Sequence, residues 1–198
     1  VVLDAKTGTT RWRVPRDEIT SWSTPLVVEH AGRTQIVVCA TRRVTSYDLA
    51  DGSVLWECGG QTVNCIPSPV VRDGVVFCMS GFKGNALLAI PLDATGDITG
   101  SDRILWQRSR GTPYVPSPML MEHLLYYTSS NSAVLTCVDA RSGETVMEPT
   151  RLPGLRSLYA SPTGVGDRIY IVSREGATLV LKKGPLLEVL ATNSLDDG

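Results

Sequence analysis

One short pattern returns along the chain: an Asp, a Gly four residues later and a Trp four residues beyond that. It occurs at Asp4, Gly8 and Trp12, at Asp48, Gly52 and Trp56 and, with Met147 in the Trp position, at Asp139 and Gly143. An expanded version runs from Asp93 to Trp106. Recurrence at a period of roughly 20 to 50 residues predicts a repeat architecture, in which each unit packs on its neighbours.

A second landmark gives the period. A hydroxyl residue and a Pro open each unit, at Pro25, Pro69, Pro118 and Pro162, and these prolines are 44, 49 and 44 residues apart. The longer interval contains DATGDITGSDRILW, whose extra Gly, Asp and Thr residues we expect to expand one surface turn.

Each unit holds four short β-rich runs separated by Gly-containing turn signals, and almost nothing favours helix. Four strands in about 44 residues are typical of a β-propeller blade. The sequence therefore predicts an all-β β-propeller of four-stranded antiparallel blades, forming one domain over 1–198. We expect a half blade at 1–14 and four complete blades at about 20–58, 64–109, 114–148 and 158–192.

The Asp and Gly of the pattern should shape the turn between the third and fourth strands of a blade. The Trp should project from the fourth strand and cover the seam with the next blade. Truncating Trp12, Trp56 or Trp106 is then expected to cost about 3 to 5 kcal/mol.

The Asp-x-x-x-Gly-x-x-x-Trp repeat, with Ser-Pro openings at this spacing, resembles the PQQ-like (quinoprotein-dehydrogenase-like) β-propellers, a family that includes the outer-membrane assembly lipoprotein BamB. The resemblance implies a seven- or eight-bladed ring closed by strands from both chain ends. The chain is then expected to be a segment of a longer protein, or a half ring completed by self-association, because open blade edges are liabilities.

Charge and hydropathy exclude some partners. The chain has 19 basic and 20 acidic residues, so no overall field attracts nucleic acid, and we expect none as a partner. No run approaches the roughly 18 apolar residues of a membrane span.

The five cysteines show no zinc-ligand spacing. Cys39, Cys78 and Cys137 stand in apolar runs, which favours buried structural thiols. Cys58 and Cys65 flank a Gly-rich connection, and their spacing is compatible with a disulfide and with two free thiols.

No motif for nucleophilic, nucleotide-dependent or metal-dependent catalysis is present. His30 and His123 each follow a Glu in a first-hairpin turn, and we expect solvated turn residues. The resembled quinone enzymes use calcium ligands, an Asp near the ring axis and, in several, a disulfide between adjacent cysteines. No Cys-Cys occurs here, and the repeat aspartates map to peripheral turns, so no catalytic, PQQ-binding or metal-binding residue is assigned.

The basic and acidic residues are expected to lie on opposite faces of the propeller, according to the loops in which they occur. One face should carry the blade connections and the loops between second and third strands. Its predicted cations are Arg13, Arg16, Arg42, Arg43, Lys83, Arg108, Arg110, Arg151, Arg156 and Arg174, and its predicted acids are Asp17, Glu18, Glu57, Glu148 and Glu175. Arginine suits contacts to carboxylates. The hypothesis is a rim for an acidic or extended protein segment, with Tyr114, Tyr159 and Trp22 as anchors. The alternative is that these arginines only solvate long loops. The opposite face, with the turn aspartates, should be acidic.

The function expected first is a non-catalytic protein-interaction or scaffold domain, which the resemblance implies for the bacterial cell envelope or periplasm. The alternatives are part of a PQQ-dependent dehydrogenase, with PQQ and calcium as cofactors, and the sensor portion of a longer signalling protein.

Overall fold

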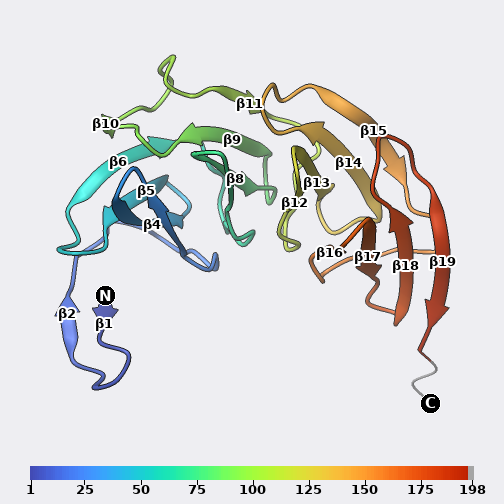
Figure 1. Ribbon diagram of the computed structural model, residues 1–198, viewed down its shortest axis with the longest axis horizontal. Helices are drawn as coiled ribbons and strands as arrows, with labels where there is room; N and C mark the ends of the chain where they lie inside the picture. Colours follow the sequence, from blue (N-terminus) through green and yellow to red (C-terminus); the bar gives the residue numbers. More distant parts are fainter. Residues whose placement is uncertain (196–198) are drawn as a thin grey trace.

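The computed structural model describes residues 1–195 and is all-β, as expected (Figure 1). A two-stranded sheet comes first, made of β1 (Val2–Leu3) and β2 (Thr10–Trp12). The first blade contains β3 (Leu26–His30), β4 (Arg33–Cys39), β5 (Arg43–Asp48) and β6 (Val54–Gly59), and the second contains β7 (Val70–Arg72), β8 (Val75–Ser80), β9 (Ala86–Pro91) and β11 (Trp106–Arg108).

The third blade contains β12 (Met119–Met121), β13 (Leu124–Thr128), β14 (Val134–Asp139) and β15 (Thr145–Arg151), and the fourth contains β16 (Thr163–Val165), β17 (Arg168–Val172), β18 (Ala177–Lys182) and β19 (Val189–Ser194). All four blades have sequential antiparallel strands. They follow one another along an open arc, with β2 at one end and β19 at the other (Figure 1).

Strand alternation builds the core, because successive side chains on a strand point to opposite faces of its sheet. On β8, Val76 and Cys78 pack into the seam with the first blade, whereas Phe77 and Met79 pack into the seam with the third. A further apolar cluster fills the seam between the third and fourth blades. Strand β8 is therefore apolar on both faces, which explains the run VVFCM.

The Asp-Gly-Trp pattern is explained by contacts between blades. In the third blade, Asp139 Oδ1 accepts the N–H of Arg141 at 2.8 Å, and Gly143 donates its N–H to the Asp139 carbonyl at 2.8 Å with φ +73°. Trp106 of the second blade lies on this turn and donates Nε1–H to the Ala140 carbonyl at 3.1 Å. A Cβ at Gly143 would come within 2.6 Å of the indole ring. The prediction that the Trp covers the seam with the next blade is confirmed.

The Ser-Pro openings also join blades. Ser68 donates its backbone N–H to the Ser117 hydroxyl at 3.0 Å, and Ser117 donates its own N–H to the Ser161 hydroxyl at 2.9 Å. Each of these hydroxyls therefore satisfies a backbone donor of the preceding blade. This accounts for a hydroxyl residue before the Pro in successive units.

The insertion between Asp93 and Trp106 lengthens the connection between β9 and β11, as expected, and most of it is exposed, but part of it forms a strand that the sequence did not predict. Its strand β10 (Gly96–Asp97) pairs in parallel with β6, placing Gly96 beside Trp56 (Figure 1). Thr99 Oγ1 then accepts the Gly59 N–H at 2.8 Å. The first blade thus has a fifth strand, and Trp56 is fully buried, whereas Trp12 and Trp106 are only partly buried.

All five cysteines are buried free thiols, which answers the question about Cys58 and Cys65. Burial raises the pKa of Cys58 to about 11 and that of Cys137 to about 12. A thiol held protonated and away from solvent is a poor nucleophile.

Native protein should therefore resist alkylation by iodoacetamide, and protein unfolded in guanidinium without reductant should gain five carbamidomethyl groups per chain by intact mass. A gain of three groups would instead show that one cysteine pair is oxidised.

Both histidines are partly exposed at the first hairpin of their blades, and the His123 side chain is 42% exposed. The His30 ring lies against Gly74 of the second blade, so close that a Cβ there would come within 2.8 Å of it. His123 Nε2 lies 3.9 Å from the Asp139 carboxylate within its own blade.

Candidate protein-interaction face

The loops between second and third strands and the links into the following blades form a continuous hydrogen-bonded row. At the seam of the second and third blades, Thr112 Oγ1 donates to the Ser80 carbonyl at 2.7 Å. Ser130 donates its N–H to the Thr112 carbonyl at 2.9 Å, and Tyr114 donates its N–H back to the Ser130 carbonyl at 3.2 Å. These bonds bring segments of two blades to one edge.

The row continues to the fourth blade. Leu158 donates its N–H to the Asn131 carbonyl at 2.8 Å, and Arg174 donates its N–H to the Ser157 carbonyl at 3.1 Å. We call residues 80–85, 109–114, 129–132, 151–159 and 173–176 the connection face.

Gly81 lets two of these loops touch. A Cβ at this residue would stand 2.4 Å from the Pro113 carbonyl oxygen and 2.5 Å from that of Thr112. Neither atom can rotate away as a side chain would, so the close approach requires Gly. Sequence reasoning had not marked Gly81, although its place in the Gly-rich loop SGFKGN was a usable signal.

An aromatic pair with a cation lies next to this approach. The rings of Phe82 and Tyr114 stack at 4.7 Å between centroids with 23° between planes, and Lys83 Nζ lies 5.6 Å from the Phe82 centroid. Lys83 has φ +51°, a left-handed conformation that costs energy for a residue with a side chain. Phe82 was also missed, because a single Phe in a loop gives no periodic signal.

A second pair lies at the far end of the row. The Arg174 guanidinium lies over the Tyr159 ring at 4.5 Å, and Tyr159 remains 48% exposed. An arginine stacked on an aromatic ring keeps its N–H groups free for a further acceptor.

The connection face holds five cations without a carboxylate partner: Lys83, Arg110, Arg151, Arg156 and Arg174. All are exposed, and the ion pairs formed among residues 1–195 involve other cations. Of the predicted acids, Glu175 lies on the connection face, and Glu148 lies just before it, on β15. Positive charge is thus concentrated on the second to fourth blades.

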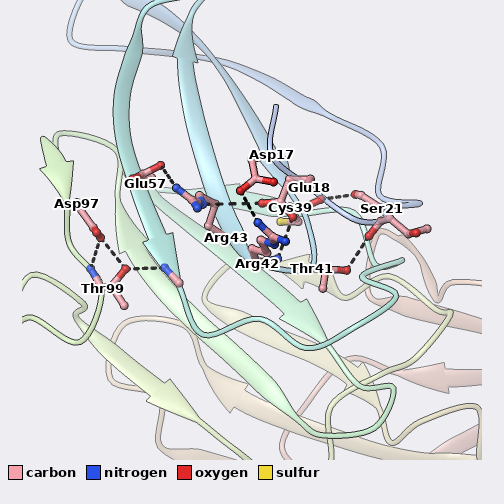
Figure 2. A network of polar contacts seen from close by, with 12 residues as sticks. Asp17, Glu18, Ser21, Cys39, Thr41, Arg42, Arg43, Glu57, Asp97 and Thr99 are labelled. Carbon is pink, nitrogen blue, oxygen red and sulfur yellow. Dashed lines mark hydrogen bonds and ion pairs between the residues drawn. The ribbon is translucent and has the colours of Figure 1, made fainter. Parts of the chain in front are cut away.

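Arg42 and Arg43 were predicted to belong to the free rim, but carboxylates neutralise both (Figure 2). Arg42 pairs with Asp17, and Arg43 donates from one terminal nitrogen to Glu57 Oε2 at 3.0 Å. That hydrogen bond is the main reason why the pKa of the Arg43 guanidinium is raised. Asp17 and Glu57 were both predicted acids of the same face, and the structure shows that they pair with these two arginines.

Arg108 also differs from expectation. Its guanidinium donates to the Gly143 carbonyl at 2.9 Å and to Thr145 Oγ1 at 3.0 Å, across the seam to the third blade. Arg108 therefore holds two blades together. Trp22, proposed as an anchor, is 66% exposed but lies on the first blade's linker, where its N–H bonds to the Cys65 carbonyl at 2.9 Å.

The turn aspartates are paired. Asp4 binds Arg11 at 2.8 Å, which with backbone donors lowers the pKa of this carboxyl to about 2. Asp48 lies 3.4 Å from Arg33, and Asp93 lies 3.4 Å from Arg103. The expectation of an acidic opposite face overlooked these cations, because each comes from a strand or turn that only folding brings alongside the Asp.

Within residues 1–195, no group of three or more His, Cys, Asp or Glu side chains is arranged to hold a metal ion. The same residues form no helix long and apolar enough to cross a membrane.

Comparison with known proteins gives the family. A sequence model described as "Outer membrane protein assembly factor BamB" matches residues 1–148. The chain belongs to the BamB family. The resemblance to PQQ-like propellers is thereby confirmed. No curated protein matches the chain by sequence.

BamB from Moraxella catarrhalis, a solved structure, superposes with a TM-score of 0.70 at 22% identity, over 96% of this chain and 56% of that one. The computationally designed protein Ika8 superposes with a TM-score of 0.57 at 10% identity, over 88% of this chain and 50% of that one. At these identities the likeness concerns the fold. The chain spans about half the length of both structures.

Proposed function

We propose that this BamB-family propeller is a non-catalytic protein-interaction domain of the cell envelope, and that it holds a partner protein on the connection face. The observation that supports the proposal most is the unneutralised row of Lys83, Arg110, Arg151, Arg156 and Arg174. Two of these cations lie over aromatic rings on a hydrogen-bonded base. Family membership supports the envelope and the protein partner.

The chemistry favours an acidic, extended segment. Carboxylates could bind arginines through two parallel hydrogen bonds, and the Phe82–Tyr114 stack and Tyr159 offer flat apolar surface for the rest of the segment. Rigid loops reduce the entropy lost on binding. Charge complementarity of this kind mainly raises the association rate and makes it sensitive to salt.

Photo-crosslinking in the source cells tests the proposal. A benzoyl-phenylalanine placed at Tyr159 should crosslink to a discrete protein that co-fractionates with the envelope, whereas the same group at Glu144, in the turn between β14 and β15, should not. A crosslink from position 144 and none from position 159 would contradict the proposal, because it would place the partner on the opposite side of the blade.

With the crosslinked protein purified, charge reversal is decisive. The double variant R110E/R156E should weaken its affinity at least about tenfold and flatten the salt dependence, because two unpaired cations become repulsive. Arg141→Glu is the matched control, since Arg141 is exposed but lies in the turn after β14, and its affinity should stay unchanged. Arg141→Glu changes the net charge by half as much as the double variant, so a loss of binding free energy about half as large would mean that net charge, and not this face, governs binding.

A further inference from the structure

A pocket of about 130 Å³ lies where residues 14–18 cross strands β5 and β6 of the first blade. Its walls include three carboxylates, from Asp17, Glu18 and Glu57, and two cations, from Arg16 and Arg43. This pocket is separate from the connection face of the second to fourth blades, and its lining is rich in carboxylates.

Glu18 is a buried carboxylate in the lining of this pocket, and one of its oxygens has no hydrogen bond. Its side chain is only 10% exposed, although it carries a carboxylate. Oε2 accepts the backbone N–H of Arg42 at 2.9 Å, but Oε1 is buried without any hydrogen bond. A buried carboxylate oxygen left without a donor is costly and therefore a strong acceptor for an arriving donor.

The nearest cation does not fill that role. Arg43 Nε stays 3.9 Å from Glu18 Oε1, beyond hydrogen-bond distance, because a terminal nitrogen of the same guanidinium is bonded to Glu57 at 3.0 Å (Figure 2). Arg42 is likewise turned to Asp17. One acceptor thus remains open between two arginines that are already bound to other carboxylates.

The walls of the pocket also fit an aliphatic stem. Pro15, Tyr47 and Val54 supply apolar surface beside the carboxylates, and Val54 is 50% exposed at the rim. Lysine and arginine side chains combine methylene groups with a terminal donor, so they bury the stem and keep the charge at a polar site. The volume of about 130 Å³ is several times what one bound water needs, which gives room for a side-chain head but not for a folded segment.

We propose that this pocket binds one lysine or arginine side chain of a protein segment, with Glu18 Oε1 accepting the hydrogen bond from its ammonium or guanidinium group. Arg42 neutralises Asp17, and Arg43 is hydrogen-bonded to Glu57, so the group left to recruit a ligand is the Glu18 carboxylate oxygen, which accepts from a cationic donor and repels an anion. The ligand differs in sign from the segment proposed for the connection face, so the two sites are testable separately.

The test is an NMR titration of the 198-residue chain with Nα-acetyl-lysine methylamide and Nα-acetyl-arginine methylamide, with the norleucine analogue as the uncharged control. At least one cationic probe should shift the amide signals of residues 16–18, 43 and 57 in a saturable way, and the norleucine analogue should not. Equal shifts from the norleucine analogue, or no saturable shift from either cation, would overturn the proposal without any variant.

Two substitutions should act in opposite directions. Glu18→Gln keeps an acceptor for the Arg42 N–H but removes the charge, and should weaken probe binding about tenfold. Arg16→Ala removes a like charge from the wall and should tighten it. Glu29→Gln, at an exposed carboxylate on β3, should change nothing. Tighter binding in Glu18→Gln, or loss of binding in Arg16→Ala, would show that the pocket selects an anion instead.

Discussion

Replacing Trp56 with Ala should lower the free energy of unfolding by about 3 to 5 kcal/mol, the upper range for removing a large buried side chain. Trp56 is fully buried, with β10 on the edge of its own strand and the seam to the second blade beside it. Ala would leave a cavity that two sheets and the added strand enclose, so little collapse can relieve it.

The matched variant is Trp56→Phe. The indole Nε1–H is buried without a partner, so Phe removes an unsatisfied donor while it keeps most of the apolar volume. We expect a loss of less than about 2 kcal/mol.

Trp22→Ala is the exposed control for the same pair, with an expected change within about 0.5 kcal/mol. Urea denaturation followed by far-UV circular dichroism measures all three, because this signal comes mainly from the backbone. A Trp56→Ala protein as stable as Trp22→Ala would mean that β10 does not cover the seam in solution.

The second large effect is expected at Gly81. Gly81→Ala should cost about 3 kcal/mol, because the added methyl group would come within 2.4 Å of one backbone oxygen and 2.5 Å of another. Relief requires residues 80–82 and 112–113 to separate. That movement lengthens the Thr112–Ser80 hydrogen bond and shifts Phe82 away from Tyr114.

Gly184→Ala is the control for this substitution, since nothing lies within 4 Å of a Cβ there, and it should be close to neutral. The same denaturation experiment compares the two. If Gly81→Ala is also neutral, the two loops at this seam can separate at little cost in free energy. The connection face would then not be the rigid base on which the proposed function depends.

Gly81→Ala also connects fold and function. The variant keeps every cation of the connection face but disturbs the geometry of Lys83 and Tyr114 on either side of the seam. A fall in partner affinity without any change in charge would therefore show that the face acts as an arranged surface, and not as a diffuse positive field.

The repeat and its roles in the blade turns and seams could be predicted from the sequence, because the residues that form them act locally or recur at a fixed period. The Asp and Gly of each turn act within five residues, as the Asp139 turn shows. The Trp and the Ser-Pro openings recur at the blade period because each contacts an equivalent place on the next blade. A contact repeated along the chain leaves a repeated residue, which a reader of the sequence can recognise.

Contacts that occur only once could not be predicted from the sequence, because they leave no repeated pattern. The insertion after Asp93 looked like a longer turn, because two residues that pair with β6 from outside carry no strand signal of their own. The sequence placed Asp17 and Glu57 on the same face as Arg42 and Arg43, but it could not show that each acid lies within ion-pair distance of one of these arginines. Arg108 looked exposed until the seam placed a carbonyl and a hydroxyl beside it.

By itself, the sequence determined the fold class, the blade period and the residues that shape the turns and seams, since periodic patterns and turn chemistry act over short distances. Only the tertiary structure decided which charges remain unpaired. The free energy of an ion depends on the few groups within about 4 Å of it, and folding brings those groups from distant parts of the chain. For this reason the structure moved the candidate binding surface to the second to fourth blades and uncovered the open carboxylate oxygen of Glu18 on the first.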